Sequence, residues 1–338
     1  MLTSPKVRAA AFAAAALLGT VFLVAAGGGA SAAPQLRIGY VAIAGTVPST
    51  RTLFGLPLLG FVRAVKKFDV QGQVVYVAPN QDPTAALESL ARQRYDLVIA
   101  GFPGGGPVDA VAGKFPQVKF LMPDLALREL PHAHANVQGT VFRAEEAGYL
   151  AGYLAALMES RRPGKHVISA VGGFKFFGVD RWIVGYDAGA KRAAPGIGNL
   201  TGYSQDFANP AKCRTIALSQ IARGSGVVFN VAGACGLGAL QAAKGESVWG
   251  IGVDIDQSFL GRHILTSAVL NQDKPVFDAI RNLVHGTFTT GGTTVRNLQN
   301  GGVGLGKISP LVPRSFLRRL AAIRRQITAG TIKVPRVT

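Results

Sequence analysis

The sequence predicts an α/β protein made of two lobes, each with a doubly wound parallel sheet covered by helices. Short apolar runs typical of buried strands alternate with amphipathic helical segments along most of the 338 residues, and this alternation indicates parallel strands joined by right-handed crossovers. The pattern also starts afresh near residue 136. About 300 residues follow the N-terminal segment, which suits two domains of ordinary size with a cleft between them.

Each lobe follows from its own series of elements. The first, residues 33–135, is predicted to have strands at 36–43, 73–77, 97–100 and 119–122 and helices at 54–67, 82–92 and 108–114. The second, residues 136–268, is predicted to have strands at 137–142, 166–171, 200–203, 227–231, 248–253 and 263–268 and helices at 144–160, 180–192, 210–223 and 237–244. We expect residues 269–288 to return to the first lobe and 289–338 to the second, so that a hinge joins the lobes.

Ligands of open parallel sheets lie beyond the carboxyl ends of the strands. The candidate binding loops are therefore residues 44–53, 101–107, 172–180, 204–209, 232–236 and 254–258.

The N-terminus carries the features of a secretory signal over residues 1–32. Lys6 and Arg8 precede an uncharged run at 9–26, and small residues with Ala30 and Ala32 at cleavage spacing follow. We therefore expect an exported protein of the periplasm, cell envelope or medium. An uncleaved anchor stays open as an alternative, because the apolar run is near the lower limit for a bilayer span. A lipid anchor is not predicted, since no cysteine stands at the cleavage point.

Cys213 and Cys235 are the only cysteines. In an exported chain such a pair either forms a disulfide or packs as two buried thiols. Cys213 lies near the start of the helix at 210–223, and Cys235 lies at the carboxyl end of the next strand. A helix antiparallel to that strand brings the two ends together, so a disulfide beside the cleft is compatible with this geometry.

The formal net charge of +18 is concentrated near the C-terminus, where no acidic residue follows Ser309. Residues 316–325 have amphipathic helical spacing, with apolar side chains on one face and arginines on the other. This basic face is either a solvated outer surface or a surface attracted to an anionic envelope polymer or membrane. A nucleic-acid partner is not predicted.

No catalytic residue, cofactor or metal site is predicted. The nucleophile elbow Gly-x-Ser-x-Gly is absent, and His132 and His134 have no cysteine or carboxylate at ligand spacing. The glycine-rich stretch at 101–106 lacks the Gly-Lys-Ser/Thr ending of a phosphate-binding loop. We interpret this stretch, which includes Phe102, as a place of close backbone approach to a ligand or to the other lobe.

Two loops of the second lobe are candidate ligand contacts. The apolar strand at 249–253 delivers Asp254 and Asp256 to its carboxyl end, where a carboxylate can accept paired hydrogen bonds from neighbouring sugar hydroxyls. Capping of a following helix is the alternative role for Asp256. The turn at 233–238, beginning with Gly233, presents backbone N–H groups or is simply a tight turn.

The motifs together resemble the basic membrane protein (PnrA-like) family of ABC-transporter substrate-binding proteins, from about residue 36 to the end. They include Gly185-Tyr186-x-Ala188-Gly189-Ala190, and the stretches that carry the resemblance are 95–106, 115–120, 136–152, 171–173, 229–233, 252–257, 265–267, 302–305 and 327–335. The resemblance implies a type I periplasmic-binding fold, a membrane permease as partner, and a purine nucleoside held by stacked aromatic rings and a ribose-binding carboxylate. Asp254 matches that carboxylate and Phe207 matches one stacking ring. Candidates for the opposing ring are Phe54, Phe102, Phe174, Phe176, Phe177 and Trp182, and packing in the core is the alternative role for most of them.

The first loop departs from the family pattern. The family has Asp-x-Gly-Gly and then Asp-Lys-Ser-Phe-Asn, where this chain has residues 43–46 and 49–53 without a carboxylate or amide. Thr46, Arg51 and Thr52 suit a ligand with more acceptor or anionic character. The sequence thus predicts a non-catalytic solute receptor for a nucleoside-like molecule, and the alternative is a surface interaction protein with a degenerate ligand site.

Overall fold

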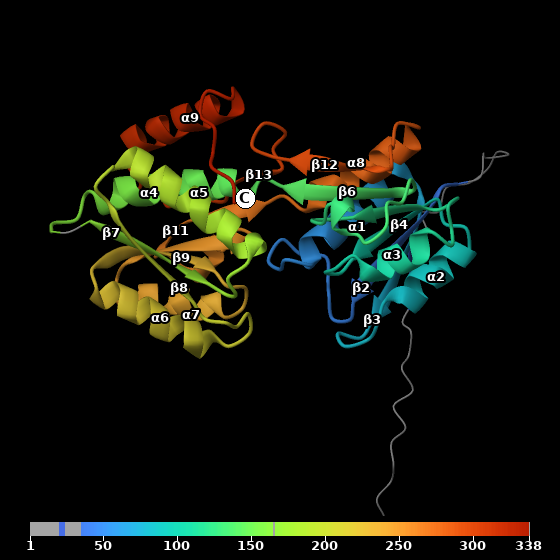
Figure 1. Ribbon diagram of the computed structural model, residues 1–338, viewed down its shortest axis with the longest axis horizontal. Coiled ribbons are helices and arrows are strands. Elements are labelled where there is room, and N and C mark those ends of the chain that lie inside the picture. The colour runs from blue at the N-terminus through green and yellow to red at the C-terminus, as the bar shows by residue number, and fades with distance from the viewer. Residues whose placement is uncertain (1–19, 24–34, 165, 338) are drawn as a thin grey trace, which may run out of the picture.

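The computed structural model describes residues 20–23, 35–164 and 166–337. The chain forms two α/β lobes that lie side by side (Figure 1), which confirms the predicted fold class. Most of the predicted signal segment lies outside the described residues; within it, β1 (Thr20–Leu23) pairs antiparallel with β3 of the first lobe. Among the helices of the described residues, none is long and apolar enough to cross a membrane.

The first lobe contains a seven-stranded sheet in the order β1-β3-β2-β4-β5-β6-β12. Its strands after β1 are all parallel: β2 (Arg37–Ile43), β3 (Gln71–Val77), β4 (Leu97–Gly101), β5 (Lys119–Met122), β6 (Val137–Phe142) and β12 (Gly292–Arg296). Helices α1 (Gly55–Phe68) and α8 (Asp273–Val284) pack on one face and α2 (Thr84–Arg92) and α3 (Gly106–Ala112) on the other. Alternate strand residues enter opposite cores, since Leu97 and Ile99 contact the first pair of helices and Val98 the second.

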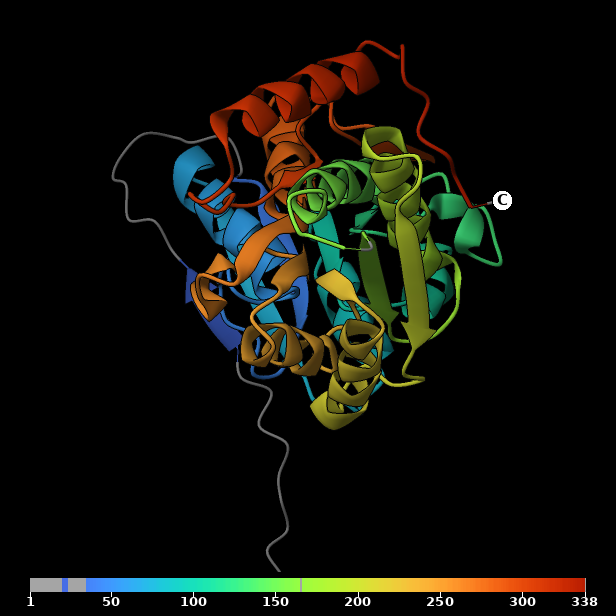
Figure 2. The same ribbon diagram turned by 90° about the vertical axis from the view of Figure 1, so that its left-hand side faces the viewer.

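The second lobe contains a six-stranded sheet in the order β13-β11-β10-β9-β7-β8. Its strands are β7 (Val167–Gly172), β8 (Gly198–Tyr203), β9 (Ser225–Val231), β10 (Trp249–Asp254), β11 (Ile264–Leu270) and the antiparallel β13 (Val303–Leu305). One face packs against α4 (Ala144–Glu159), α5 (Phe177–Ala193) and α9 (Arg314–Thr328), and the other against α6 (Pro210–Ala222) and α7 (Gly236–Gly245). Helix α9 lies on the outside, against α4 (Figure 2).

Glycines set the close packing of α4 against α5. A Cβ at Gly152 would overlap the carbonyl oxygen of Tyr186, and one at Gly189 would overlap that of Tyr149. The small-residue spacing in both helices therefore lets the two backbones touch. With the sheet and α9 against its other sides, the whole of α4 is buried.

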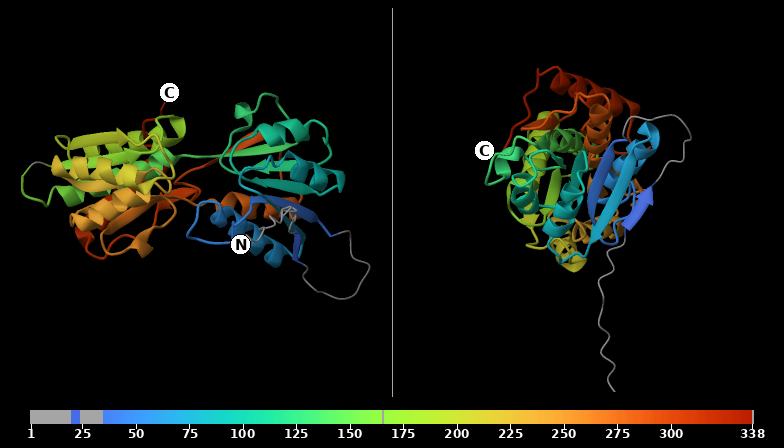
Figure 3. Two further views of the ribbon diagram at one scale, coloured as in Figure 1. Left: turned by 90° about the horizontal axis from the view of Figure 1, so that it is seen from below. Right: turned by 90° about the vertical axis from the view of Figure 1, so that its right-hand side faces the viewer.

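Three segments run between the lobes, after β6, after β11 and after β12 (Figure 3). They are bonded to one another: the Arg143 N–H donates to the Arg296 carbonyl at 2.7 Å, and the Asn271 N–H donates to the Gly302 carbonyl at 2.8 Å. The Leu298 N–H donates to a carboxylate oxygen of Glu146 at 2.8 Å. The connection is thus one hydrogen-bonded unit.

The pairing of β6 differs from the predicted boundary before residue 136. Val137 stands opposite Phe120 of β5 and β12 continues the same sheet, so both β6 and β12 belong to the first lobe's sheet. The chain crosses only after Phe142. The restart of the sequence pattern marks where a strand begins, but it does not tell which sheet edge that strand joins.

Candidate ligand site between the lobes

Residues from both lobes meet where strands of the two sheets end. Asp254 ends β10 and Asp124 follows β5, and both have left-handed backbone conformations, with φ of 64° and 61°. Aspartate tolerates this conformation better than most residues. Arg181 of α5 approaches Asp124, with Nη2 at 3.4 Å from Oδ1, and its Nη1 donates to the Phe142 carbonyl at 3.3 Å. The ion pair therefore joins the lobes beside the connecting segments.

The electrostatics of this group favour a neutral carboxyl. Burial, and after it the nearby Asp124 carboxylate, raise the pKa of Asp254 to about 7 against the opposing effect of Arg181. Burial also raises the pKa of Asp124, again against the effect of Arg181. Within the described residues the Asp254 side chain has no hydrogen-bond partner, so its oxygens are available to the hydroxyl or N–H donors of a ligand.

Exposed aromatic rings gather on the second lobe in the loops that follow β7 and β8. Phe174, Phe176 and Phe207 are 42%, 50% and 40% exposed. The Phe207 ring centroid lies 5.2 Å from that of Phe174 and 6.3 Å from that of Phe176. Such a cluster of exposed large rings is a candidate binding surface, and its geometry suits contact with a planar group.

Glycines position Phe207 in this cluster. A Cβ at Gly173 would overlap the Phe207 ring. Gly233 has φ of 56°, and the N–H of Cys235 donates to the Phe207 carbonyl at 2.9 Å. The predicted roles of Gly233 and Phe207 are thus linked, because the turn at Gly233 holds the backbone of the Phe207 loop.

The first loop reaches the second lobe through Arg51. Its guanidinium carbon lies 5.3 Å from the ring centroid of Phe259 in the 3₁₀ turn Ser258–Leu260. Thr46 is half-buried, and its N–H closes a turn onto the Ile43 carbonyl at 3.0 Å. The Thr52 hydroxyl accepts the Gly55 N–H at 3.2 Å. Thr52 therefore helps to begin α1, whereas Arg51 is the loop residue that meets the opposite lobe.

Two predicted ligand contacts have structural roles instead. Phe102 is only 7% exposed and packs in the core formed by α2 and α3, so its ring does not face the junction of the lobes. Asp256 accepts the N–H of Ser258 at 3.0 Å and that of Lys307 at 3.1 Å, one on each carboxylate oxygen. Both oxygens are occupied in holding two loops together, which agrees with the capping alternative for Asp256.

Cys213 and Cys235 form a disulfide, with 5.6 Å between their Cα atoms. It joins the first turn of α6 to the residue that precedes α7, and both cysteines are fully buried. Since Cys235 also bonds to the Phe207 loop, the disulfide stabilises the backbone behind the aromatic cluster.

Asp124 and Arg181 were not among the predicted site residues. The signal for Asp124 was present, because it follows a buried strand just as Asp254 does. Arg181 gave no such signal, since a basic residue near the start of a helix is usually solvated. Only the packing of α5 beside the connecting segments brings its guanidinium to Asp124.

The two-lobed fold is shared with solute-binding proteins of ABC transporters. One such protein from Aeropyrum pernix K1 superimposes with a TM-score of 0.73 at 21% identity, covering 89% of this chain and 94% of the other. A second, from Conexibacter woesei DSM 14684, gives 0.70 at 23% identity, covering 89% and 98%. These similarities support the fold.

The family is shown by sequence. Residues 58–338 match the model of the Bmp family, described as ABC transporter substrate-binding protein PnrA-like, and the chain belongs to this family. It is 32% identical over 273 residues to the ABC transporter nucleoside-binding protein BmpA of Lactococcus lactis subsp. cremoris (strain MG1363), covering 75% of each chain. It is 30% identical over 257 residues to basic membrane protein B of Borrelia garinii subsp. bavariensis (strain ATCC BAA-2496 / DSM 23469 / PBi), covering 74% of this chain and 72% of the relative.

Proposed function

We propose that this protein is an exported receptor that binds a nucleoside-like solute between its lobes, closes about the hinge and delivers the solute to an ABC permease. The observation that carries the proposal is the meeting of Asp254 with Asp124 of the other lobe, at the sheet edge whose loops also carry the exposed rings of Phe174, Phe176 and Phe207. A ligand that contacts both lobes favours the closed state by its differential affinity. No bond is made or broken in this function.

The chemistry of the site suggests how each part of the ligand is held. The carboxyl groups accept hydrogen bonds from vicinal hydroxyls of a ribose, and the phenylalanine rings stack on a flat base. Arg51 and Thr46 of the first loop supply donors, so the base edge that they meet carries acceptors. A relative named as nucleoside-binding, at 32% identity, supports the same ligand class.

The test is a thermal-shift screen of the purified protein against nucleosides, free bases, sugars and anionic metabolites. A ligand at one hundred times its dissociation constant adds about 2.7 kcal/mol to the free energy of unfolding. We expect a shift with a purine nucleoside that disappears in Asp254→Ala and persists in Asp256→Ala. If no nucleoside shifts the wild-type transition, the proposed ligand class is wrong.

The second candidate function is attachment to an anionic surface through α9. Its arginines at 314, 318, 319, 324 and 325 are all exposed, and within the described residues none of them forms an ion pair. The opposite face packs through Leu320, Ile323 and Ile327, so the helix cannot turn this charge inward. The retained fold with an altered first loop would then serve contact with the envelope rather than solute capture.

Vesicle flotation distinguishes this candidate. We expect co-flotation with phosphatidylglycerol vesicles that weakens as salt rises, is lost when Arg318, Arg319, Arg324 and Arg325 are changed to Gln, and survives their change to Lys. Equal recovery with phosphatidylcholine vesicles would contradict an electrostatic surface role.

A further inference from the structure

A second cluster of chemically active side chains lies on the first lobe, apart from the ligand site. The Asp109 carboxylate of α3 receives both His132 and His134: Oδ2 lies 2.9 Å from His132 Nδ1, and Oδ1 lies 2.9 Å from His134 Nε2. The cluster stands before the amino end of β6, whereas the residues between the lobes follow carboxyl ends of strands. It is not used in the proposed solute-binding function.

We propose that Asp109, His132 and His134 bind a divalent transition cation of the Zn²⁺ type. One ligand atom from each residue can be chosen so that all three lie within 4.8 Å of one another. Zinc bonds of about 2.0–2.2 Å place tetrahedral ligand atoms roughly 3.3 Å apart, so the two Asp–His separations are already near this spacing. The atoms that now share two hydrogen bonds can share one cation, with water completing its coordination.

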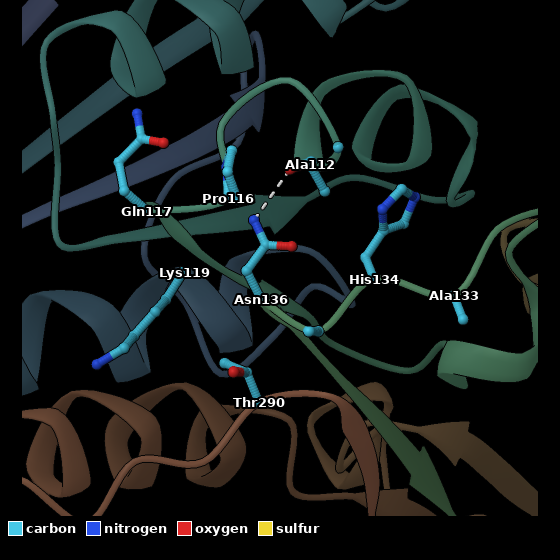
Figure 4. Close-up of a pocket in the computed structure, with 10 residues that line it drawn as sticks. Ala112, Pro116, Gln117, Lys119, Ala133, His134, Asn136 and Thr290 are labelled. Atoms are coloured by element: carbon cyan, nitrogen blue, oxygen red, sulfur yellow. Dashed lines mark hydrogen bonds between the residues drawn. The ribbon is translucent and has the colours of Figure 1, made fainter.

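The scaffold fixes two of the three ligands. The Asn136 amide donates to the carbonyls of Ala112, Phe115 and Val118 at 3.0, 3.0 and 2.8 Å, which ties the turn after α3 to the start of β6. His134 lies two residues before this anchor, on the rim of an open pocket of about 320 Å³ (Figure 4). The side chains of His134 and Asp109 are 10% and 11% exposed, so their positions are held by packing.

The third ligand supplies adjustment and access. The His132 side chain is 76% exposed, and its ring centroid lies 6.2 Å from that of His134. A rotation of this exposed ring can bring its nitrogen closer to that of His134 without moving the core. The site thus has two packed ligands, one exposed ligand and a coordination position open to solvent, the arrangement of an accessible three-ligand zinc site.

The ligand types select the cation. Imidazole nitrogen with a single carboxylate suits Zn²⁺ and its neighbours, whereas Mg²⁺ and Ca²⁺ prefer all-oxygen sites. Bound metal would fasten residues 130–135 to α3 and so raise the stability of the first lobe. Solute binding between the lobes is expected to be unchanged, so the metal site and the proposed function are tested separately.

The experiment is calorimetric titration of the protein, purified without a histidine tag and stripped with chelator, with ZnCl₂ and separately with MgCl₂. We expect one equivalent of Zn²⁺ and no Mg²⁺. His132→Ala and Asp109→Asn are each expected to weaken zinc binding by more than about 10-fold, since even outer-shell changes have effects of this size. His285→Ala, an exposed histidine outside the cluster, is the matched control.

Asp109→Asn distinguishes a metal site from a cluster that only forms hydrogen bonds. The asparagine amide keeps an acceptor oxygen for a histidine N–H, but it has no negative charge to bind a cation. Exposed His132 can be changed without disturbing the core, and circular dichroism checks that each variant is folded. Visible absorption of bound Co²⁺ that is lost with His132→Ala would identify imidazole ligation. Failure of the wild type to take up zinc, or equal binding by all variants, would overturn the proposal.

Discussion

Asp254→Asn is expected to stabilise the ligand-free protein at pH 8 while it weakens solute binding. Burial raises the pKa of Asp254 to about 7, whereas an aspartate in an unfolded chain titrates near about 3.9. Between these two values the folded state holds a proton that the unfolded state has released. The free energy of unfolding therefore falls as pH rises from about 4 to 7, and this contribution is absent in the asparagine variant.

The size of the effect follows from the same difference. About 3 pKa units at about 1.36 kcal/mol each give roughly 4 kcal/mol at pH 8, and this is an upper bound because the side chain keeps some contact with solvent. At pH 5 the pH is only about one unit above the pKa of aspartate in the unfolded chain, so the asparagine variant is expected to be more stable than the wild type by about 1.5 kcal/mol. The stabilisation by asparagine should thus grow between pH 5 and pH 8.

Urea denaturation at the two pH values measures this difference. Asp256→Asn is the matched control, since it makes the same chemical change two residues away but removes an acceptor from a backbone N–H. It should lose about 1 kcal/mol at both pH values. If Asp254→Asn is no more stable than the wild type at pH 8, or if its advantage does not grow from pH 5, the assignment of a buried, unfavourably charged carboxylate is wrong.

Two further predictions concern the scaffold of the second lobe. Changing Cys213 and Cys235 together to Ser opens a loop whose ends are 22 residues apart. The chain-entropy relation predicts that the free energy of unfolding falls by about 3 kcal/mol. A reductant should lower the urea midpoint of the wild type to that of the double variant and leave the midpoint of the variant unchanged. Gly152→Ala places a methyl group on the carbonyl of Tyr186 and should lose about 1–3 kcal/mol by forcing α4 from α5. Gly245→Ala, where nothing lies within 4 Å, should lose nothing; equal melting temperatures for these two glycine variants would contradict the packing argument.

The elements that the sequence predicted well are those in which local pattern and tertiary role agree. The expected helix at 54–67 is α1, Gly55–Phe68, and the expected strand at 97–100 is β4, Leu97–Gly101. Asp254 could also be placed at a strand end, because in a parallel sheet an apolar run that stops at a carboxylate usually marks the carboxyl end of a buried strand. Its protonation equilibrium could not be predicted, since Asp124 and Arg181 come from distant parts of the chain.

The burial of Phe102 follows from the alternation of side chains along β4 and the residues after it. Val98 and Ala100 enter the core formed by α2 and α3, and the period-two alternation of a strand continues this face to Phe102. The ring is therefore expected in the core rather than beside a ligand. His132 and His134 show the opposite case, because their carboxylate partner lies more than 20 residues earlier, at Asp109, and sequence spacing cannot reveal a ligand set assembled by folding.

For the proposed closure of the lobes on a solute, the connecting segments and the charged site together suggest a mechanism. Hydrogen bonds among Arg143, Arg296, Glu146 and Leu298 hold the crossovers to one another, so a rotation of the lobes is best absorbed at their ends without breaking this unit. Arg181 stands beside it, bonded to the Phe142 carbonyl and paired with Asp124 across the lobes. When the lobes close, water is removed from the carboxyl groups of Asp124 and Asp254, and burying these groups without hydrogen bonds costs free energy. The hydroxyls of a bound ligand replace the lost hydrogen bonds and lower this cost. Without the ligand the full cost remains, so closure should depend on the solute.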